Sequence, residues 1–177
     1  QNQTIDTQFT GNVQNILYEK AIQKALRNNK GFSTFTPYSF NEEFKTIYKG
    51  SSKVTNGAFT IKYYIPKDIN YEVGERKLVL YAYTDNRDAV TDTKVIVGGL
   101  NENGLNDDEI PQGKLYMNNL NFADGGITDR DPYLIACLTD NTGINATGSS
   151  IGHDIVGTID GEIQEAYVLN EYYESGD

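Results

Sequence analysis

Alternating apolar and polar positions are the main pattern along the chain, and they predict β-strands. Between residues 59 and 65, apolar side chains at every second position alternate with Thr60, Lys62 and Tyr64, as in a strand with one buried face. The dipeptide Asn56-Gly57 stands before this run and supplies the two positive-φ positions of a type I′ turn. The sequence therefore predicts a hairpin whose strands cover residues 44–55 and 58–65.

Further short strands are predicted at residues 77–83 and 93–97, with the polar turn 84–88 between them. The pattern resumes at residues 114–117, 132–138, 153–159 and 166–169. Short strands at this spacing, joined by turn residues, are typical of an antiparallel β-sandwich rather than of parallel βαβ units. The predicted fold class is therefore all-β.

The segment 13–26 fits two patterns. Its apolar residues lie at helical spacing, and it is rich in good helix formers such as Glu19, Lys20 and Lys24. The alternation of Phe9, Gly11, Val13, Asn15 and Leu17 would serve a strand equally well. The pattern by itself leaves helix and strand open.

Residues 98–111 form the clearest boundary, because they combine glycines, asparagines and acidic residues and end at Pro111. We therefore predict a β-sandwich domain at 1–98, a linker at 99–111 and a second β domain at 112–177. The second domain is shorter than the roughly 100 residues of a complete sandwich, so we expect it to be truncated. The chain starts at Gln1 without a signal peptide, and we read it as a piece of a longer protein.

The charges argue against one class of partner. The chain has 15 Lys and Arg against 25 Asp and Glu, a net charge of −10, and such a surface repels phosphate backbones. We therefore expect no nucleic-acid partner. With one cysteine and one histidine, the chain can form no internal disulfide and no zinc site rich in Cys and His.

Cys137 and His153 are the natural pair to consider as nucleophile and base. Cys137 lies within the apolar run 134–138, where a free cysteine usually serves as a small packing residue, and His153 follows a glycine at a turn. We therefore predict no catalytic residues.

Acidic and asparagine-rich clusters make Asp107, Asp108 and Asp140 weak candidates for calcium ligands. The clusters lack the spacing of a dedicated calcium loop, so we expect no metal and no other cofactor. The many tyrosines would suit a sugar-stacking surface, but tyrosine is also a common strand residue.

Several phrases in order resemble one family. They are Phe9-x-Gly11-x-Val13, Leu17-Tyr18-Glu19-Lys20, Tyr48-Lys49-Gly50-x-x-Lys53-Val54-Thr55-Asn56-Gly57-x-Phe59, Ile65-Pro66-Lys67-Asp68-Ile69-Asn70-Tyr71, Lys114-Leu115-Tyr116-Met117-Asn118, Gly125-Gly126-Ile127-Thr128, Gly143-Ile144-Asn145, Gly152-His153-Asp154-Ile155 and Val168-Leu169-Asn170-x-Tyr172-Tyr173-Glu174. Together they resemble the region after the peptidase domain in the type IX secretion system sortase (PorU type) of Bacteroidetes, a gingipain-type cysteine peptidase. The resemblance is weakest between residues 22 and 41.

The resemblance implies an immunoglobulin-like sandwich, with a strand over residues 9–20, and leaves the stretch from Ile22 to Asn29 open to a helix. It also implies a parent protein at the outer-membrane surface of a Gram-negative bacterium, which removes the C-terminal signal of secreted cargo. The family's catalytic His and Cys belong to an upstream domain, so no catalytic residue is carried over.

Two functions follow as hypotheses. The first is a non-catalytic scaffold that contacts other domains of the parent and the outer-membrane secretion components. The alternative is an independent surface adhesion or glycan-binding module. If the second domain is truncated, residues 172–177 expose an unpaired strand edge, and we expect self-association there or local disorder.

Overall fold

The computed structural model describes residues 4–42, 45–66, 69–99, 109–147 and 154–176. The fold is all-β, built from antiparallel sheets in a sandwich-like arrangement, as the sequence predicted. Its strands are β1 (Gly11–Tyr18), β2 (Ile22–Ala25), β3 (Ser39–Glu42), β4 (Thr46–Val54), β5 (Gly74–Tyr83), β6 (Asp88–Val97), β7 (Gln112–Met117), β8 (Leu134–Thr139), β9 (Val156–Gly157) and β10 (Tyr167–Val168). Two short 3₁₀ helices, Ile163–Glu165 and Asn170–Tyr172, complete the described elements.

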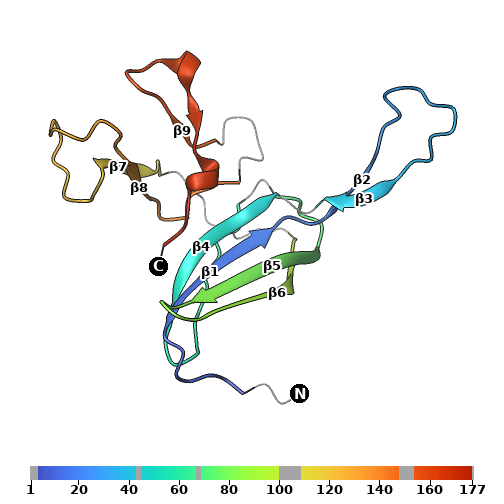
Figure 1. The fold of residues 1–177 in the computed structure, drawn as a ribbon, viewed down its shortest axis with the longest axis horizontal. Coiled ribbons are helices and arrows are strands. Elements are labelled where there is room, and N and C mark those ends of the chain that lie inside the picture. Colours follow the sequence, from blue (N-terminus) through green and yellow to red (C-terminus); the bar gives the residue numbers. More distant parts are fainter. Residues whose placement is uncertain (1–3, 43–44, 67–68, 100–108, 148–153, 177) are drawn as a thin grey trace. The chain divides into compact units, whose positions relative to one another are not determined.

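The main sheet has four strands in the order β4-β1-β5-β6, and Figure 1 shows them side by side. β1 lies in the middle and pairs with β4 and β5, so the strand interpretation of residues 13–18 is confirmed and the helix is not formed. Val13, Asn15 and Leu17 point to one face and are fully buried. Residues 13–18 therefore form a strand despite their helix propensity, because a central strand gains hydrogen bonds to two neighbouring strands and buries every second side chain.

The type I′ turn is confirmed, because Asn56 and Gly57 have φ of 54° and 75° and Thr55 N–H donates to the carbonyl of Ala58 over 2.9 Å. The predicted return strand 58–65 is wrong beyond this point, since residues 59–66 are irregular. The outer edge of β4 is instead used by Ser175, which pairs in parallel with Gly50. Of the side chains predicted to face inward, Ile61 and Tyr63 are half-buried, whereas Phe59 and Ile65 are 41% and 39% exposed, so the predicted inward face forms only in part.

The core lies on one face of the main sheet. Leu17, Ile47, Ile69 and Leu78 form its buried centre, and Tyr63 packs against them. Ile69 and Tyr63 come from the irregular stretch after the turn, so this stretch supplies the layer that covers the sheet. A β-bulge between Leu17 and Tyr18 lets Ile47 reach the core.

The stretch left open between Ile22 and Asn29 is not helical. Its first half is β2, which pairs with β3 to form a two-stranded ribbon. The loop between them is held by Asn28, whose side chain donates to the carbonyl of Phe32 over 2.7 Å and accepts from the Phe32 amide over 2.9 Å.

The chain forms two compact units, one from Gln1–Asn101 with Asn145–Asp177 and one from Glu102–Ile144. This grouping differs from the predicted domain at 112–177, because residues after 145 belong to the first unit. Ser175 donates to the carbonyl of Lys49 over 2.9 Å, and Lys49 forms an ion pair of 2.8 Å with Glu174. Most of the predicted linker, residues 100–108, lies outside the described residues.

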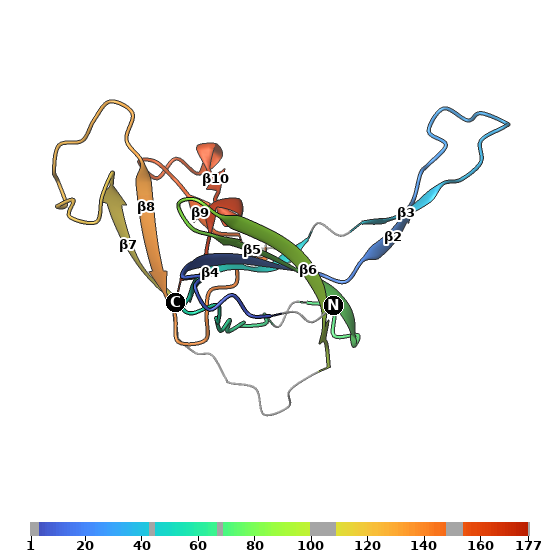
Figure 2. The same cartoon turned by 60° about the horizontal axis from the view of Figure 1, so that its bottom comes forward.

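The second unit contains the predicted strands at 114–117 and 132–138, which appear as the paired β7 and β8. The first unit also contains the pair β9 and β10, both labelled in Figure 2, which are shorter than predicted. Of the described residues, none lies in a helix long and apolar enough to cross a membrane.

Candidate functional site

The most distinctive polar cluster in the described residues is centred on a buried ion pair. Arg76 lies near the start of β5, and Glu19 follows the end of β1. The Arg76 side chain is 0% exposed and the Glu19 side chain 7%. Nε and Nη2 of Arg76 lie 3.0 and 2.9 Å from Oε1 of Glu19, so two guanidinium nitrogens contact the same carboxylate oxygen.

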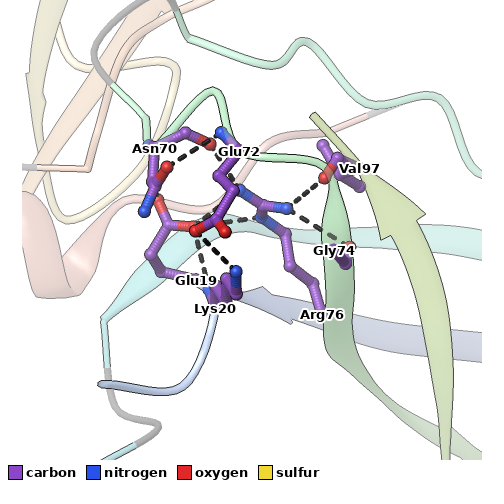
Figure 3. Close-up of polar contacts among 7 residues, drawn as sticks. All are labelled: Glu19, Lys20, Asn70, Glu72, Gly74, Arg76 and Val97. Carbon is purple, nitrogen blue, oxygen red and sulfur yellow. Dashed lines mark hydrogen bonds and ion pairs between the residues drawn. The ribbon is translucent and has the colours of Figure 1, made fainter. Parts of the chain in front are cut away.

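The remaining donors of Arg76 point at backbone carbonyls, as Figure 3 shows. Nη2 donates to the carbonyl of Asn70 over 2.7 Å, and Nη1 donates to the carbonyls of Val97 and Gly74. Glu19 in turn accepts from the amides of Lys20 and Asn70 over 2.8 and 3.2 Å. The pair thus joins the end of β1, the stretch before β5 and the end of β6.

A second ion pair lies at the exposed rim of this cluster. Nζ of Lys20 lies 2.7 Å from Oε2 of Glu72, and Glu72 N–H donates to Oδ1 of Asn70 over 2.9 Å. The hydrogen bond and the positive charge of Lys20 lower the pKa of Glu72. Because both side chains are solvated, this contact adds little to stability.

The cluster is structural rather than a ligand site. A guanidinium has five N–H donors, and those of Arg76 are directed at one carboxylate and three carbonyls. Its burial also denies access to a substrate. Chemically, the arrangement can orient and fasten the loop 69–74, and its central pair, Arg76 and Glu19, is shielded from solvent.

Cys137 lies on β8 in the second unit and is exposed, so its interpretation as a small packing residue is wrong. The predicted apolar run faces solvent at this point because β8 belongs to a two-stranded sheet. His153 lies outside the described residues, so the structure does not test whether it approaches Cys137.

Of the calcium candidates, Asp107 and Asp108 lie outside the described residues. Asp140 uses Oδ1 to accept from both the amide and the hydroxyl of Thr142, over 2.7 and 2.9 Å, which is a local turn contact. The described ranges contain no group of three or more His, Cys, Asp or Glu side chains placed to hold a metal ion.

The tyrosines divide between the core and the surface. Tyr63 meets Tyr48 edge-to-face, with ring centroids 5.1 Å apart, beside the core cluster. Tyr81 and Tyr83 stack at 5.5 Å on the opposite face of the sheet, where the hydroxyl of Tyr81 donates to Oδ2 of Asp88 over 3.2 Å. Their roles therefore differ, although both pairs come from strand-like sequence.

Sequence reasoning missed the pairing of Glu19 with Arg76. Glu19 stood out only as a good helix former, and Arg76, at the start of a hydrophobic run, was not singled out. The available signal was that Glu19 and Asn70 occur in two of the family phrases, although these residues lie in loops.

Comparison with solved structures gives an informative similarity. No family model matches the chain, and no curated protein matches it. The crystal structure of dimeric latent PorU from Porphyromonas gingivalis is similar, with a TM-score of 0.51 and 27% sequence identity. The match covers 94% of this chain and 16% of that chain, so the chain corresponds to a small part of that protein.

We predict that Glu19→Gln lowers the free energy of unfolding by about 3 kcal/mol, because it leaves the Arg76 cation buried without its counterion. The measurement is urea unfolding followed by tyrosine fluorescence. Glu75→Gln is the matched control, since it breaks the exposed Lys94–Glu75 pair, whose side chains are 71% and 62% exposed, and we expect a loss of less than about 1 kcal/mol. Equal losses in the two variants would contradict a special role for the buried pair.

We also predict that the chain loses stability in alkaline solution through its packed tyrosines. Burial raises the pKa of Tyr63, and Tyr48 beside it raises that pKa further. Folding therefore favours the neutral phenol, and this stability is complete below about pH 10, the ordinary tyrosine pKa, and declines as the pH rises through the higher pKa of the folded state.

Unfolding midpoints in urea between about pH 9 and about pH 11 test this. Tyr63→Phe should flatten the decline, whereas Tyr64→Phe, at a ring that is 54% exposed, should leave it unchanged. An identical slope in the wild type and the Tyr63→Phe variant would refute the assignment.

Proposed function

We propose that the chain is a non-catalytic segment of a PorU-like cysteine peptidase at the bacterial cell surface, whose parent protein processes the C-terminal signals of secreted cargo. The observation that carries this proposal is the similarity to PorU of Porphyromonas gingivalis along 94% of the chain. The ordered phrases in the sequence point to the same family. At 27% identity, neither the sequence similarity nor the fold similarity would suffice alone for this assignment, and the two support it together.

The arrangement of the described residues supports a scaffold rather than a peptidase role. The chain has a single cysteine, and it lies on the exposed two-stranded sheet of the second unit. A cysteine peptidase needs its thiol held beside an imidazole and next to a substrate cleft. The buried charged residues Arg76 and Glu19 are instead engaged with each other and with backbone groups of neighbouring segments.

In this role the chain is a spacer and interaction segment. Its partners are other domains of the parent and outer-membrane components of the secretion system. The face of the main sheet opposite to the core suits contacts of this kind, since a β-sheet with one buried face leaves the other available.

A glycan-binding module is a second candidate, and the stacked pair Tyr81–Tyr83 favours it. The two rings lie on an exposed strand face with Asp88 beside them, and aromatic faces with a neighbouring carboxylate can bind a sugar ring. A glycan array with the wild type and Tyr81→Ala tests it. Specific binding that the variant loses would favour this candidate over the scaffold.

For the scaffold we predict two results. The reading frame upstream of this chain should encode a gingipain-type domain with a catalytic Cys and His. The purified chain should not cleave a peptide that carries a C-terminal secretion signal, whereas the parent protein should cleave it. Cleavage by the chain that Cys137→Ser abolishes, or the lack of an upstream peptidase domain, would overturn the proposal.

A further inference from the structure

The strands β2 and β3, together with the loop 26–38 that joins them, form an exposed arm at residues 22–42. Among the described residues β2 and β3 pair only with each other, and Figure 2 shows both strands leading into the loop. Every residue from 22 to 41 is exposed except Phe35, which is half-buried. The arm therefore adds no side chain to the buried core, and its surface is available to another body.

The loop of this arm has the opposite charge to the chain as a whole. The chain has a net charge of −10, whereas residues 23–41 contain Lys24, Arg27 and Lys30 and no Asp or Glu. Lys24 forms an ion pair with Glu42 at the base of the arm. Arg27 and Lys30 form no ion pair with any described residue, and both are exposed. The loop thus presents two positive charges to its surroundings.

Large apolar side chains lie in the same loop as these charges. Leu26, Phe32 and Tyr38 are 52%, 62% and 64% exposed. The strands below them have a polar face, on which Gln23 pairs with Asn41. Large apolar side chains that gather in the solvent mark a site of interaction rather than a part of the fold.

The backbone of the loop is hydrogen-bonded within the loop itself. Leu26 N–H donates to the carbonyl of Tyr38 over 2.9 Å, and Phe35 N–H donates to the carbonyl of Phe32 over 3.2 Å. The side chain of Asn28 bonds both the amide and the carbonyl of Phe32. Backbone groups that have a partner inside the loop can leave bulk water at a lower cost than unpaired ones.

We propose that the loop 26–38 docks on the surface of a bilayer with anionic headgroups. Leu26, Phe32 and Tyr38 then lie at the boundary between headgroups and acyl chains, and Arg27 and Lys30 contact the phosphates. Tyrosine suits this boundary because its ring is apolar and its hydroxyl stays hydrated. The remainder of the chain is acidic and is repelled by such a surface, so the arm is the part that approaches it.

A lipid surface fits the arm better than an acidic protein does. A stable protein interface buries about 800 Å² on each partner around a packed apolar centre. Leu26 and Tyr38 begin and end the loop and Phe32 lies midway along it, with charged and hydroxyl side chains between them. Apolar side chains spaced in this way can each enter a fluid surface, which needs no fixed complementary shape.

A vesicle-sedimentation experiment with matched charge variants tests the docking. We expect the wild-type chain to sediment with vesicles of phosphatidylcholine and phosphatidylglycerol, far less with phosphatidylcholine alone, and less as salt is added. The double variant Arg27→Glu, Lys30→Glu should bind the mixed vesicles at least about twentyfold more weakly, because each basic residue near an anionic surface contributes about fivefold. The control Lys62→Glu, Lys114→Glu changes the net charge equally at two exposed positions outside the arm, and we expect a loss below about threefold.

A tryptophan probe identifies the part of the chain that touches the lipid. The chain contains no Trp, so Phe32→Trp reports from the loop alone. Tyr133→Trp, at a residue of the second unit that is 78% exposed, is the control. With the mixed vesicles we expect a blue-shifted emission that brominated lipids quench in the first variant, and an unchanged emission in the second.

Three results would overturn the proposal. They are a wild-type chain that does not sediment with the mixed vesicles, equal losses in the two charge variants, and an unshifted Phe32→Trp emission on vesicles that hold the chain. The last result would assign the contact to another surface. Thermal melting shows whether each variant is folded. All these measurements use the chain alone, so their failure is distinct from the lack of an upstream peptidase domain, which would overturn the scaffold role.

Discussion

The burial of Arg76 is the constraint on which the main sheet depends. A guanidinium that is 0% exposed costs several kcal/mol in lost hydration unless its donors are all used. Satisfying it requires Glu19 at the end of β1, the carbonyl of Asn70 in the preceding loop and the carbonyl of Val97 at the end of β6. If any of these groups moved away, a donor of the buried guanidinium would lose its hydrogen-bond acceptor. One side chain therefore holds three segments of the chain together.

This fastening explains how an irregular stretch can serve as a layer of the fold. Residues 59–66 are irregular, and a segment without strand pairing normally stays at the surface. Here the Asn70 end is held to Glu19 and Arg76, which brings Ile69 into the core beside Leu17 and Leu78. The polar cluster thus fixes where the apolar side chains are buried, and their burial stabilises the sheet in return.

Local signals in the sequence predicted the local features well. Alternation identified β5, β6, β7 and β8, and Asn56-Gly57 identified its turn, because side-chain period and positive φ are properties of neighbouring residues. The failures all depend on distant residues. The return strand after the turn was lost because Ser175 occupies the edge of β4, and the role of Arg76 was invisible because its partners stand at positions 19, 70 and 97. Similarly, Cys137 was interpreted as a small packing residue because an apolar run does not reveal that, among the described residues, its sheet has two strands.

The two edge strands of the main sheet, β4 and β6, differ in what lies against their outer sides, and this difference bears on function. At β4 the chain's own C-terminal residues pair with the strand and add the Lys49–Glu174 ion pair, so this edge is closed to other chains near Gly50. Among the described residues β6 pairs with β5, and the outer part of the strand carries the charged residues Asp92 and Lys94. A net charge of −10 repels most anionic partners at long range, but salt screens this repulsion beyond about 10 Å, and within the ladder only the local signs matter. The local order of charges, rather than the net charge, therefore decides which strands could approach this edge.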